Sequence, residues 1–173
     1  MKKFKNKTLY ILIILIFCVA VIGSSAYTIQ PYGWSTTYIP IKDATSSQYT
    51  QIVKDSIAAW NNSVPGVKFY FNKKAANTIY SGSYDKSWVG CYSYYTKKGK
   101  TYKFNIYLND KLLASKSDSY KQSTLVHELG HALSLADNPP GVISIMRHDR
   151  NRNTMIVPQQ DDIDGVKKHY NLK

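Results

Sequence analysis

The sequence predicts an α+β domain that follows a short N-terminal targeting segment. Four segments between residues 34 and 108 have the composition of β-strands, and a segment of helical periodicity lies among them. Two further helical segments follow, at residues 119–136 and 158–170. With 173 residues, the chain is long enough for one domain with a substantial core and too short for two comfortable ones.

Residues 1–26 have the pattern of a secretory signal peptide. Lysines near the start precede an apolar run from Leu9 to Ile22, and small residues lead up to a cleavage site after Ala26. The run is shorter than the ~20 residues that span a bilayer, which favours cleavage over a permanent anchor. A lipid anchor at Cys18 is disfavoured by the bulky residues before it. We expect a secreted domain over residues 27–173 without a stable membrane anchor, or a wall- or membrane-associated one where the signal is retained.

The chain is strongly basic, with a formal net charge of +12. Such a balance favours acidic partners, and electrostatic contact with acidic cell-wall polymers is one expectation. The lysines are scattered and form no nucleic-acid-binding motif, so no nucleic-acid partner is expected. Cys91 is the only cysteine after the signal segment, which excludes an intramolecular disulfide. We expect a monomer stabilised by its core.

The first half of the domain predicts a strand, a helix and a second strand. Residues 34–41 (WSTTYIPI) have a β-rich composition that ends near a proline. Residues 46–61 place apolar side chains at helical spacing, with a serine available as N-cap and a Pro-Gly pair beyond the end. Residues 67–71 (VKFYF) then predict the second strand.

The second half predicts two strands and two helices. Residues 88–95 and 101–108 predict strands joined by a turn that contains Gly99. Residues 119–136 contain no proline and place apolar residues on one face, which indicates a helix. Residues 158–170 predict a closing helix.

The helix at 119–136 carries the motif His-Glu-x-x-His at residues 127–131. Positions four apart share a helix face, so His127 and His131 can present two imidazole nitrogens to one metal ion. Two neutral imidazoles with an open position suit Zn²⁺. Glu128 is turned by ~100° and can reach a water bound to that ion, which makes it the candidate general base.

The simpler alternative is that these side chains decorate a solvated helix face. Two of the four histidines lie in this pentad, and Glu128 is the only glutamate among the eleven acidic residues of the chain. Such concentrated use of scarce residues favours the zinc site.

The third metal ligand is less certain from the residues alone. The absence of a second glutamate excludes a glutamate in this role, and Asp137 lies six residues after His131, where the longer zinc motif has its third histidine. A carboxylate is an acceptable zinc ligand, although Asp137 can also serve as a turn residue before Asn138-Pro139-Pro140-Gly141. His148 is the rival ligand. Asp149 is a more distant one.

These motifs together resemble the matrixin-type metzincins, a family of zinc metalloproteases. The resemblance runs through His-Glu-Leu-Gly-His-Ala-Leu at 127–133, Ser-Ile-Met-Arg at 144–147 and residues 160–166. It implies a metzincin-like domain with a mixed, mostly parallel sheet of four or five strands, an active-site helix and a C-terminal helix. Met146 then matches the methionine that lies under the metal site. An aspartate at position 137 is similar to the third ligand of the snapalysin-like enzymes.

The chain departs from the family pattern at Ser134, which replaces the glycine that turns the chain after the active-site helix. A non-glycine residue at that turn predicts backbone strain. No cysteine-containing inhibitory segment and no second, structural zinc site are expected. Calcium can bind loop aspartates and carbonyl groups, but no calcium-loop motif supports it.

The resemblance implies a secreted zinc endopeptidase that takes a protein or peptide substrate in extended form. We expect the substrate to lie along an edge strand, for which residues 104–108 are the candidate. Two other functions stay open: a zinc-containing module that binds wall polymer, and an amidase-type enzyme that acts on a non-protein amide. Neither would be distinguished from a protease by its metal ligands, but a binding module has no need of Glu128.

Overall fold

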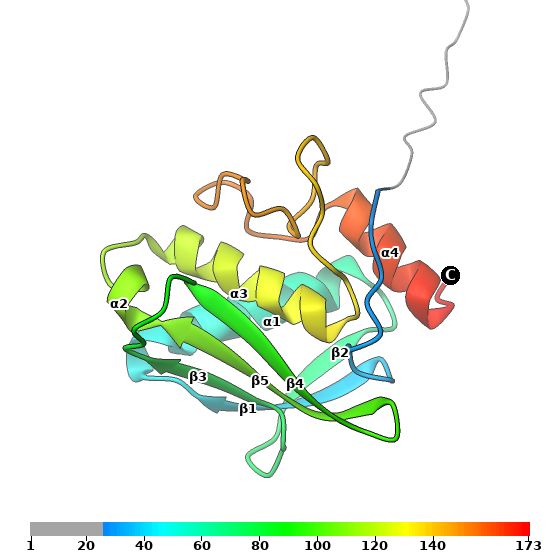
Figure 1. Ribbon diagram of the computed structural model, residues 1–173, viewed down its shortest axis with the longest axis horizontal. Helices are drawn as coiled ribbons and strands as arrows, with labels where there is room; N and C mark the ends of the chain where they lie inside the picture. The colour runs from blue at the N-terminus through cyan, green and yellow to red at the C-terminus, as the bar shows by residue number, and fades with distance from the viewer. Residues whose placement is uncertain (1–25) are drawn as a thin grey trace, which may run out of the picture.

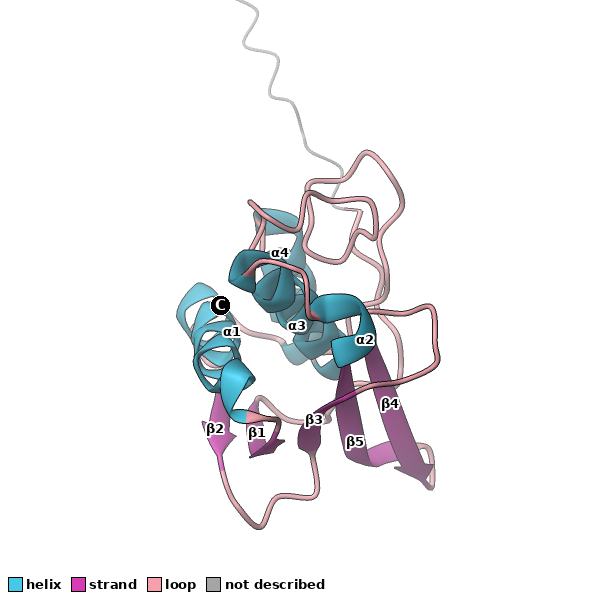
Figure 2. Ribbon diagram, turned by 90° about the vertical axis from the view of Figure 1, so that its left-hand side faces the viewer, coloured by secondary structure: helices cyan, strands magenta, loops and turns pink. Residues whose placement is uncertain are grey.

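The computed structural model describes residues 26–173. The predicted signal peptide, including Cys18, lies outside the described residues apart from Ala26. The domain is α+β: helices α1 and α3 cover one face of a single sheet, and the chain after α3 passes over the far side of that helix (Figures 1 and 2). Within the described part of the chain, no helix is long and apolar enough to cross a membrane.

The sheet has five strands in the order β2-β1-β3-β5-β4. The pairs β1–β2, β1–β3 and β3–β5 are parallel, and β4 pairs antiparallel with β5, so the sheet is mixed and mostly parallel as predicted. The strands span β1 Tyr38–Ala44, β2 Lys68–Phe71, β3 Thr78–Gly82, β4 Gly90–Lys97 and β5 Lys100–Asn109.

Two expectations about the strands need correction. The first strand begins at Tyr38 rather than at Trp34. The Trp34 N–H donates to the Ala132 carbonyl at the end of α3 (2.8 Å), and residues 35–37 form bends. The expected edge strand at residues 104–108 is wrong, since β5 pairs with β3 on one side and with β4 on the other. The edge nearest to α3 is β4, which packs against that helix.

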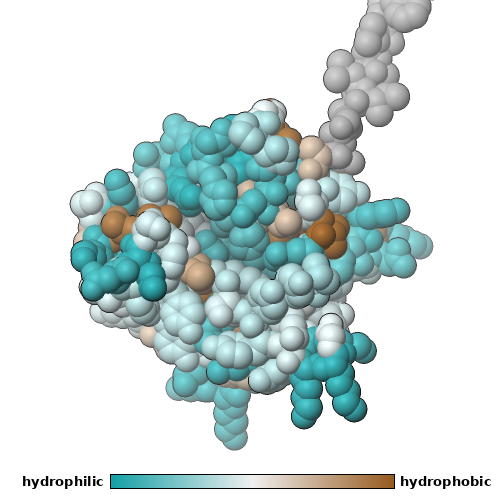
Figure 3. All heavy atoms as spheres, in the orientation of Figure 1, coloured by the Kyte–Doolittle hydropathy of each residue, from teal (hydrophilic) through white to brown (hydrophobic). Residues whose placement is uncertain are grey.

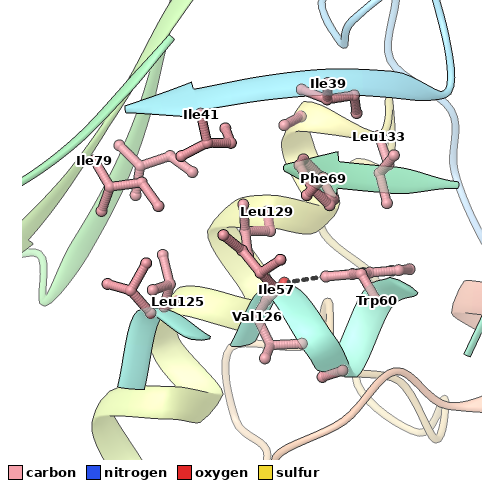
Figure 4. Packing of buried hydrophobic residues seen from close by; sticks show 14 of the residues in the cluster. Ile39, Ile41, Ile57, Trp60, Phe69, Ile79, Leu125, Val126, Leu129 and Leu133 are labelled. Carbon is pink, nitrogen blue, oxygen red and sulfur yellow. Dashed lines mark hydrogen bonds between the residues drawn. The ribbon is translucent and has the colours of Figure 1, made fainter. Parts of the chain in front are cut away.

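The helices supply the second layer and the cap. The 3₁₀ turn Ser47–Tyr49 leads into α1 Thr50–Ser63, and a short α2 Asp110–Leu113 follows β5. Helix α3 spans Asp118–Ala132 with Ser117 as its N-cap, and α4 spans Gln160–Tyr170. The core lies between the sheet and the helices α1 and α3, and includes Ile39 of β1, Ile57 of α1 and Leu129 of α3 (Figure 4). Trp60 joins the two helices by donating from Nε1 to the Val126 carbonyl at 2.8 Å (Figure 4).

Helix α3 ends at Ala132, four residues before the predicted end. Ser134 adopts φ 69°, the left-handed conformation that the sequence predicted to be strained at this turn. Gly33 permits the turn, because a Cβ on it would lie 2.3 Å from the Ser134 nitrogen. The N-terminal segment holds the chain after the turn through the Gln30 N–H to the Ser134 carbonyl and the Ala136 N–H to the Thr28 carbonyl, both at 2.8 Å.

Asp162 on α4 fixes the loop that contains Met146. Its fully buried carboxylate accepts hydrogen bonds from the Ser144 hydroxyl (2.5 Å) and the Ile145 N–H (2.8 Å), and Ser144 Oγ accepts in turn from the Met146 N–H. Met146 packs under α3, where a Cβ on Gly130 would lie 2.4 Å from its sulfur. Met146, which the resemblance places under the metal site, is therefore buried beneath the helix that carries the histidines.

Candidate metal centre

His127 and His131 lie one turn apart on α3, with ring centroids separated by 4.8 Å. Both Nε2 atoms face Asp137, whose Oδ1 lies 3.2 Å from His127 Nε2 and 3.6 Å from His131 Nε2. The candidate ligand atoms of the three residues lie within 4.8 Å of one another. The turn after α3 thus brings all three predicted ligands to one point.

Backbone carbonyls orient both imidazoles. His127 Nδ1 lies 3.0 Å from the Ile145 carbonyl oxygen, and His131 Nδ1 lies 2.8 Å from that of Leu135. A carbonyl can only accept, so each neutral ring carries its proton on Nδ1 and keeps the Nε2 lone pair available to a metal. Sequence reasoning missed these two carbonyls, because main-chain acceptors leave no signature in residue type.

Burial keeps the histidines neutral. His127 is 2% exposed, and this burial lowers its pKa to about 3. Burial also lowers the pKa of His131. Neutral imidazole is the form that binds a metal ion. The two histidines can therefore bind one near neutral pH without first releasing a proton.

Glu128 lies between α3 and the first residue of β4. It is 6% exposed, and burial, followed by the nearby Asp137 carboxylate, raises its pKa to about 8. Gly90 makes room for it, because a Cβ at that position would lie 2.6 Å from Glu128 Oε1. Glu128 faces the same space as the histidines without being one of the three clustered residues.

His148 also reaches the site. Its Nε2 lies 3.0 Å from Asp137 Oδ2, the oxygen that does not face the α3 histidines, and its ring centroid is 5.3 Å from that of His127. His148 is therefore a partner of Asp137 on the outer side, and it does not belong to the compact group of three. Asp149 instead pairs with Arg147 at 2.7 Å.

Arg150 is a second feature that sequence reasoning missed. It is 7% exposed and lies behind His127, with Nη1 3.4 Å from His127 Nδ1. It donates to Ser123 Oγ at 3.1 Å and to the Ser123 carbonyl at 2.8 Å, and so ties the loop after Met146 to α3. In the sequence this arginine belongs to a charged run, Arg147-His148-Asp149-Arg150-Asn151-Arg152, that looks solvated throughout.

Two hollows flank the site along β4. One, of about 460 Å³, reaches from Glu128 toward Trp88 and Tyr120. The other, of about 300 Å³, reaches from Glu128 toward Tyr92 and Tyr94. A larger hollow of about 490 Å³ lies far from α3, beside β1, β2 and α1, and has no histidine in its lining. The two hollows at β4 belong to the candidate site, because all three clustered residues line the smaller one and His127 and Glu128 line the other.

The donor set fits a zinc ion. It consists of two imidazole Nε2 atoms and one carboxylate oxygen, which are ligand types of catalytic zinc sites. The side chain of Asp137 is 45% exposed, so solvent reaches the point where the three residues would hold a zinc ion. Such a set leaves room for water or substrate, as a catalytic site requires.

A scan against protein-family models finds no match, and a search of curated proteins finds none either. Solved structures are similar at low identity. A chain of the GM1-bound ECX AB5 holotoxin matches at 16% identity and a TM-score of 0.56, over 78% of this chain and 80% of that one. Myroilysin matches at 14% identity and a TM-score of 0.55, over 85% of this chain and 99% of that one. High choriolytic enzyme 1 is a hatching enzyme zinc-protease from the medaka fish Oryzias latipes. It matches at 15% identity and a TM-score of 0.51, over 82% of this chain and 95% of that one. The chain thus has a fold found in zinc metalloproteases.

Proposed function

We propose that the chain is a secreted, zinc-dependent endopeptidase of the matrixin-like metzincin type. The observation that carries the proposal is the convergence of His127, His131 and Asp137, with both histidine Nδ1 atoms tied to carbonyls and Glu128 beside them. The fold shared with a zinc protease supports the same conclusion.

In this mechanism His127, His131 and Asp137 hold the metal. Zinc, when bound, supplies Lewis acidity and lowers the pKa of water. Glu128 takes the proton from the attacking water and delivers it to the leaving amine. Glu128 lies on the turn of α3 that carries both histidines, so its carboxylate can reach a water bound beside them. Met146 packs against Gly130 of α3, and Arg150 lies beside His127 Nδ1. Both residues position α3 and take no part in proton transfer.

The substrate is bound as an extended peptide along β4. This strand is the edge of the sheet beside α3, and Gly90 at its start contacts the Glu128 side chain. An edge strand offers unpaired N–H and C=O groups to which a peptide backbone can bond. The peptide bond to be cleaved would then lie beside His127 and Glu128, which line both hollows.

Digestion assays test this function. Purified protein should cleave casein, and a chelator should abolish cleavage until zinc is restored. Glu128→Gln should lose hydrolysis by several orders of magnitude while it still binds one zinc ion, because Glu128 moves the proton and does not hold the metal. Asp118→Asn is the matched control, since it makes the same carboxylate-to-amide change on an 84% exposed side chain of the same helix.

The outcomes separate the candidate functions. Near-normal casein cleavage by Glu128→Gln would overturn the mechanism. Chelator-sensitive release from wall polymer without casein cleavage would assign the amidase function instead, and wall binding without any turnover would assign the binding module. Secretion rests on residues 1–26, and mass spectrometry of exported protein should find Tyr27 as the new N-terminus.

A further inference from the structure

The two hollows beside Glu128 differ in charge. The hollow toward Tyr92 and Tyr94 has no lysine or arginine in its lining, and it contains the Asp137 carboxylate. The hollow toward Trp88 and Tyr120 contains the guanidinium of Arg152. A peptide bound along β4 therefore meets a cationic wall on one side of the scissile bond only.

Arg152 is held in place by neutral groups. Its Nη1 donates to Thr124 Oγ1 at 3.2 Å, and its guanidinium lies 5.5 Å from the centroid of the Tyr120 ring. Both partners belong to α3, so the arginine rests on the same helix that carries Glu128. These contacts orient the side chain without pairing its charge with a carboxylate in direct contact.

No acidic side chain among residues 26–173 forms an ion pair with Arg152 within 4.0 Å. Glu128 is the one carboxylate in the lining of this hollow; the charge of Arg152 acts to lower its pKa, but the two side chains form no ion pair within 4.0 Å. His127 and the exposed His148 also line the hollow. The buried Arg150 does not line it, and its guanidinium donates to Ser123 and to the Arg147 carbonyl. The unpaired positive charge in the hollow thus belongs to Arg152.

We propose that Arg152 makes the hollow between Trp88 and Tyr120 selective for an acidic side chain, so that the protease cleaves next to a Glu or Asp residue of its substrate. The inference rests on the proposed endopeptidase function and names its substrate class. A volume of about 460 Å³ accommodates either side chain. The planar guanidinium can bind a carboxylate through two parallel hydrogen bonds, and the aromatic walls shield that pair from water.

The size of the preference follows from the exposure of the pair. Arg152 is half-buried, so its pair with a substrate carboxylate is stronger than one on an open surface and weaker than a fully buried one. We expect kcat/KM to favour glutamate over glutamine by ~10-fold at this position, a ratio that corresponds to one charge-assisted contact. Lysine should be the poorest of the three, because it meets a like charge.

Peptides that differ only at the residue on one or the other side of the scissile bond test the inference. Each position carries Glu, Gln or Lys, and kcat/KM is measured for the wild type and for Arg152→Glu. On one side the wild type should prefer Glu over Gln over Lys, and Arg152→Glu should prefer Lys over Glu. Lys54→Glu makes the same charge change on the exposed face of α1 and should keep the wild-type order.

Binding supplies a second readout that does not need turnover. Fluorescent Glu and Lys peptides are titrated into zinc-loaded Glu128→Gln and into the double variant that also carries Arg152→Glu, after circular dichroism has confirmed that both are folded. The Glu peptide should bind the first protein more tightly, and the Lys peptide the second. Arg152→Gln serves in place of the charge reversal where the latter fails to fold, and it should lower the Glu-to-Gln ratio toward one.

The failures are distinguishable. Equal kcat/KM for the three peptides on both sides, or a preference that persists in the Arg152 variants, would overturn the inference and leave the endopeptidase function standing. Failure of the wild type to cleave any peptide or casein would overturn the proposed function, and the inference with it.

Discussion

At the scale of single residues, two backbone carbonyls decide which nitrogen of each histidine faces the metal site. The Ile145 carbonyl belongs to the loop held by Asp162, and the Leu135 carbonyl belongs to the turn at Ser134. The positions of both loops therefore determine how the two imidazole rings of α3 are oriented, although neither loop contributes a histidine to the group of three.

The identity of the third ligand gives the first prediction. Asp137 Oδ1 faces both α3 histidines, whereas His148 contacts only the opposite oxygen of Asp137. Asp137→Ala should weaken zinc binding by more than the ~10–100-fold that is typical of losing a residue that merely supports a ligand, and it should abolish activity. His148→Ala should keep one zinc ion per chain. Zinc titration of both variants decides, and normal affinity in Asp137→Ala with metal loss in His148→Ala would transfer the role to His148.

The burial of His127 predicts how the metal-free protein responds to acid. The pKa of His127 falls from 6.5 when it is exposed to about 3 in the folded state. Below pH 6.5 the unfolded chain therefore binds a proton that the folded chain does not, and the free energy of unfolding should decrease as the pH falls toward 3. Urea unfolding of metal-free protein at pH 7 and pH 5 measures this decrease. It should be smaller in His127→Gln, and an unchanged decrease would show that His127 is not responsible.

At the scale of elements, sequence and structure agree where the information is local. Helix α3 and its motif follow from apolar spacing and from a serine N-cap, and the strain at Ser134 follows from its residue type at the turn. The interior place of β5 could not be predicted, because strand order depends on pairing between segments far apart in the chain. Burial of Arg150 is likewise non-local, since its partners lie on α3, 27 residues earlier.

The contact between Gly33 and Ser134 shows how one element positions another. The N-terminal segment crosses the end of α3 there, and a Cβ on Gly33 would lie within 2.6 Å of three Ser134 atoms. Gly33→Ala should lower the free energy of unfolding by about 2 kcal/mol or more, because the crossing must open to admit the methyl group. It should also weaken zinc binding, since residues 134–136 lead directly to Asp137.

Chemical denaturation with and without zinc measures both effects of Gly33→Ala. Gly99→Ala is the control: its added Cβ meets nothing within 4 Å, although its φ of 74° costs some strain. Zinc affinity should be unchanged in the control. If Gly33→Ala kept the stability and the zinc affinity of the wild type, the N-terminal segment would not position residues 134–136 as argued.

At the scale of the whole molecule, the metal site joins two parts of different architecture. The sheet, α1 and α3 enclose most of the buried apolar side chains (Figure 4), whereas residues 133–159 form a cap over α3 without a helix or strand of their own. The face seen in Figure 3 is mostly hydrophilic, in keeping with the net charge of +12. Polar contacts of Asp162 and Arg150 hold the cap against α4 and α3, and Leu135, Ile145 and Met146 anchor it in the core.

Removal of zinc should therefore loosen the cap and spare the rest of the domain. A metal that binds only the folded state at 100 times its Kd stabilises it by ~2.7 kcal/mol, which corresponds to roughly 5–10 °C in Tm for a domain of this size. Chelation should lower the Tm by about this amount, while the far-UV circular dichroism at 25 °C stays nearly constant, because the helices and strands belong to the core. Hydrogen exchange should accelerate in residues 137–158 and remain slow in β1, β3 and α1. Global loss of helical signal on chelation would instead mean that the core itself depends on the metal, and an unchanged Tm would mean that no ion links α3 to the cap.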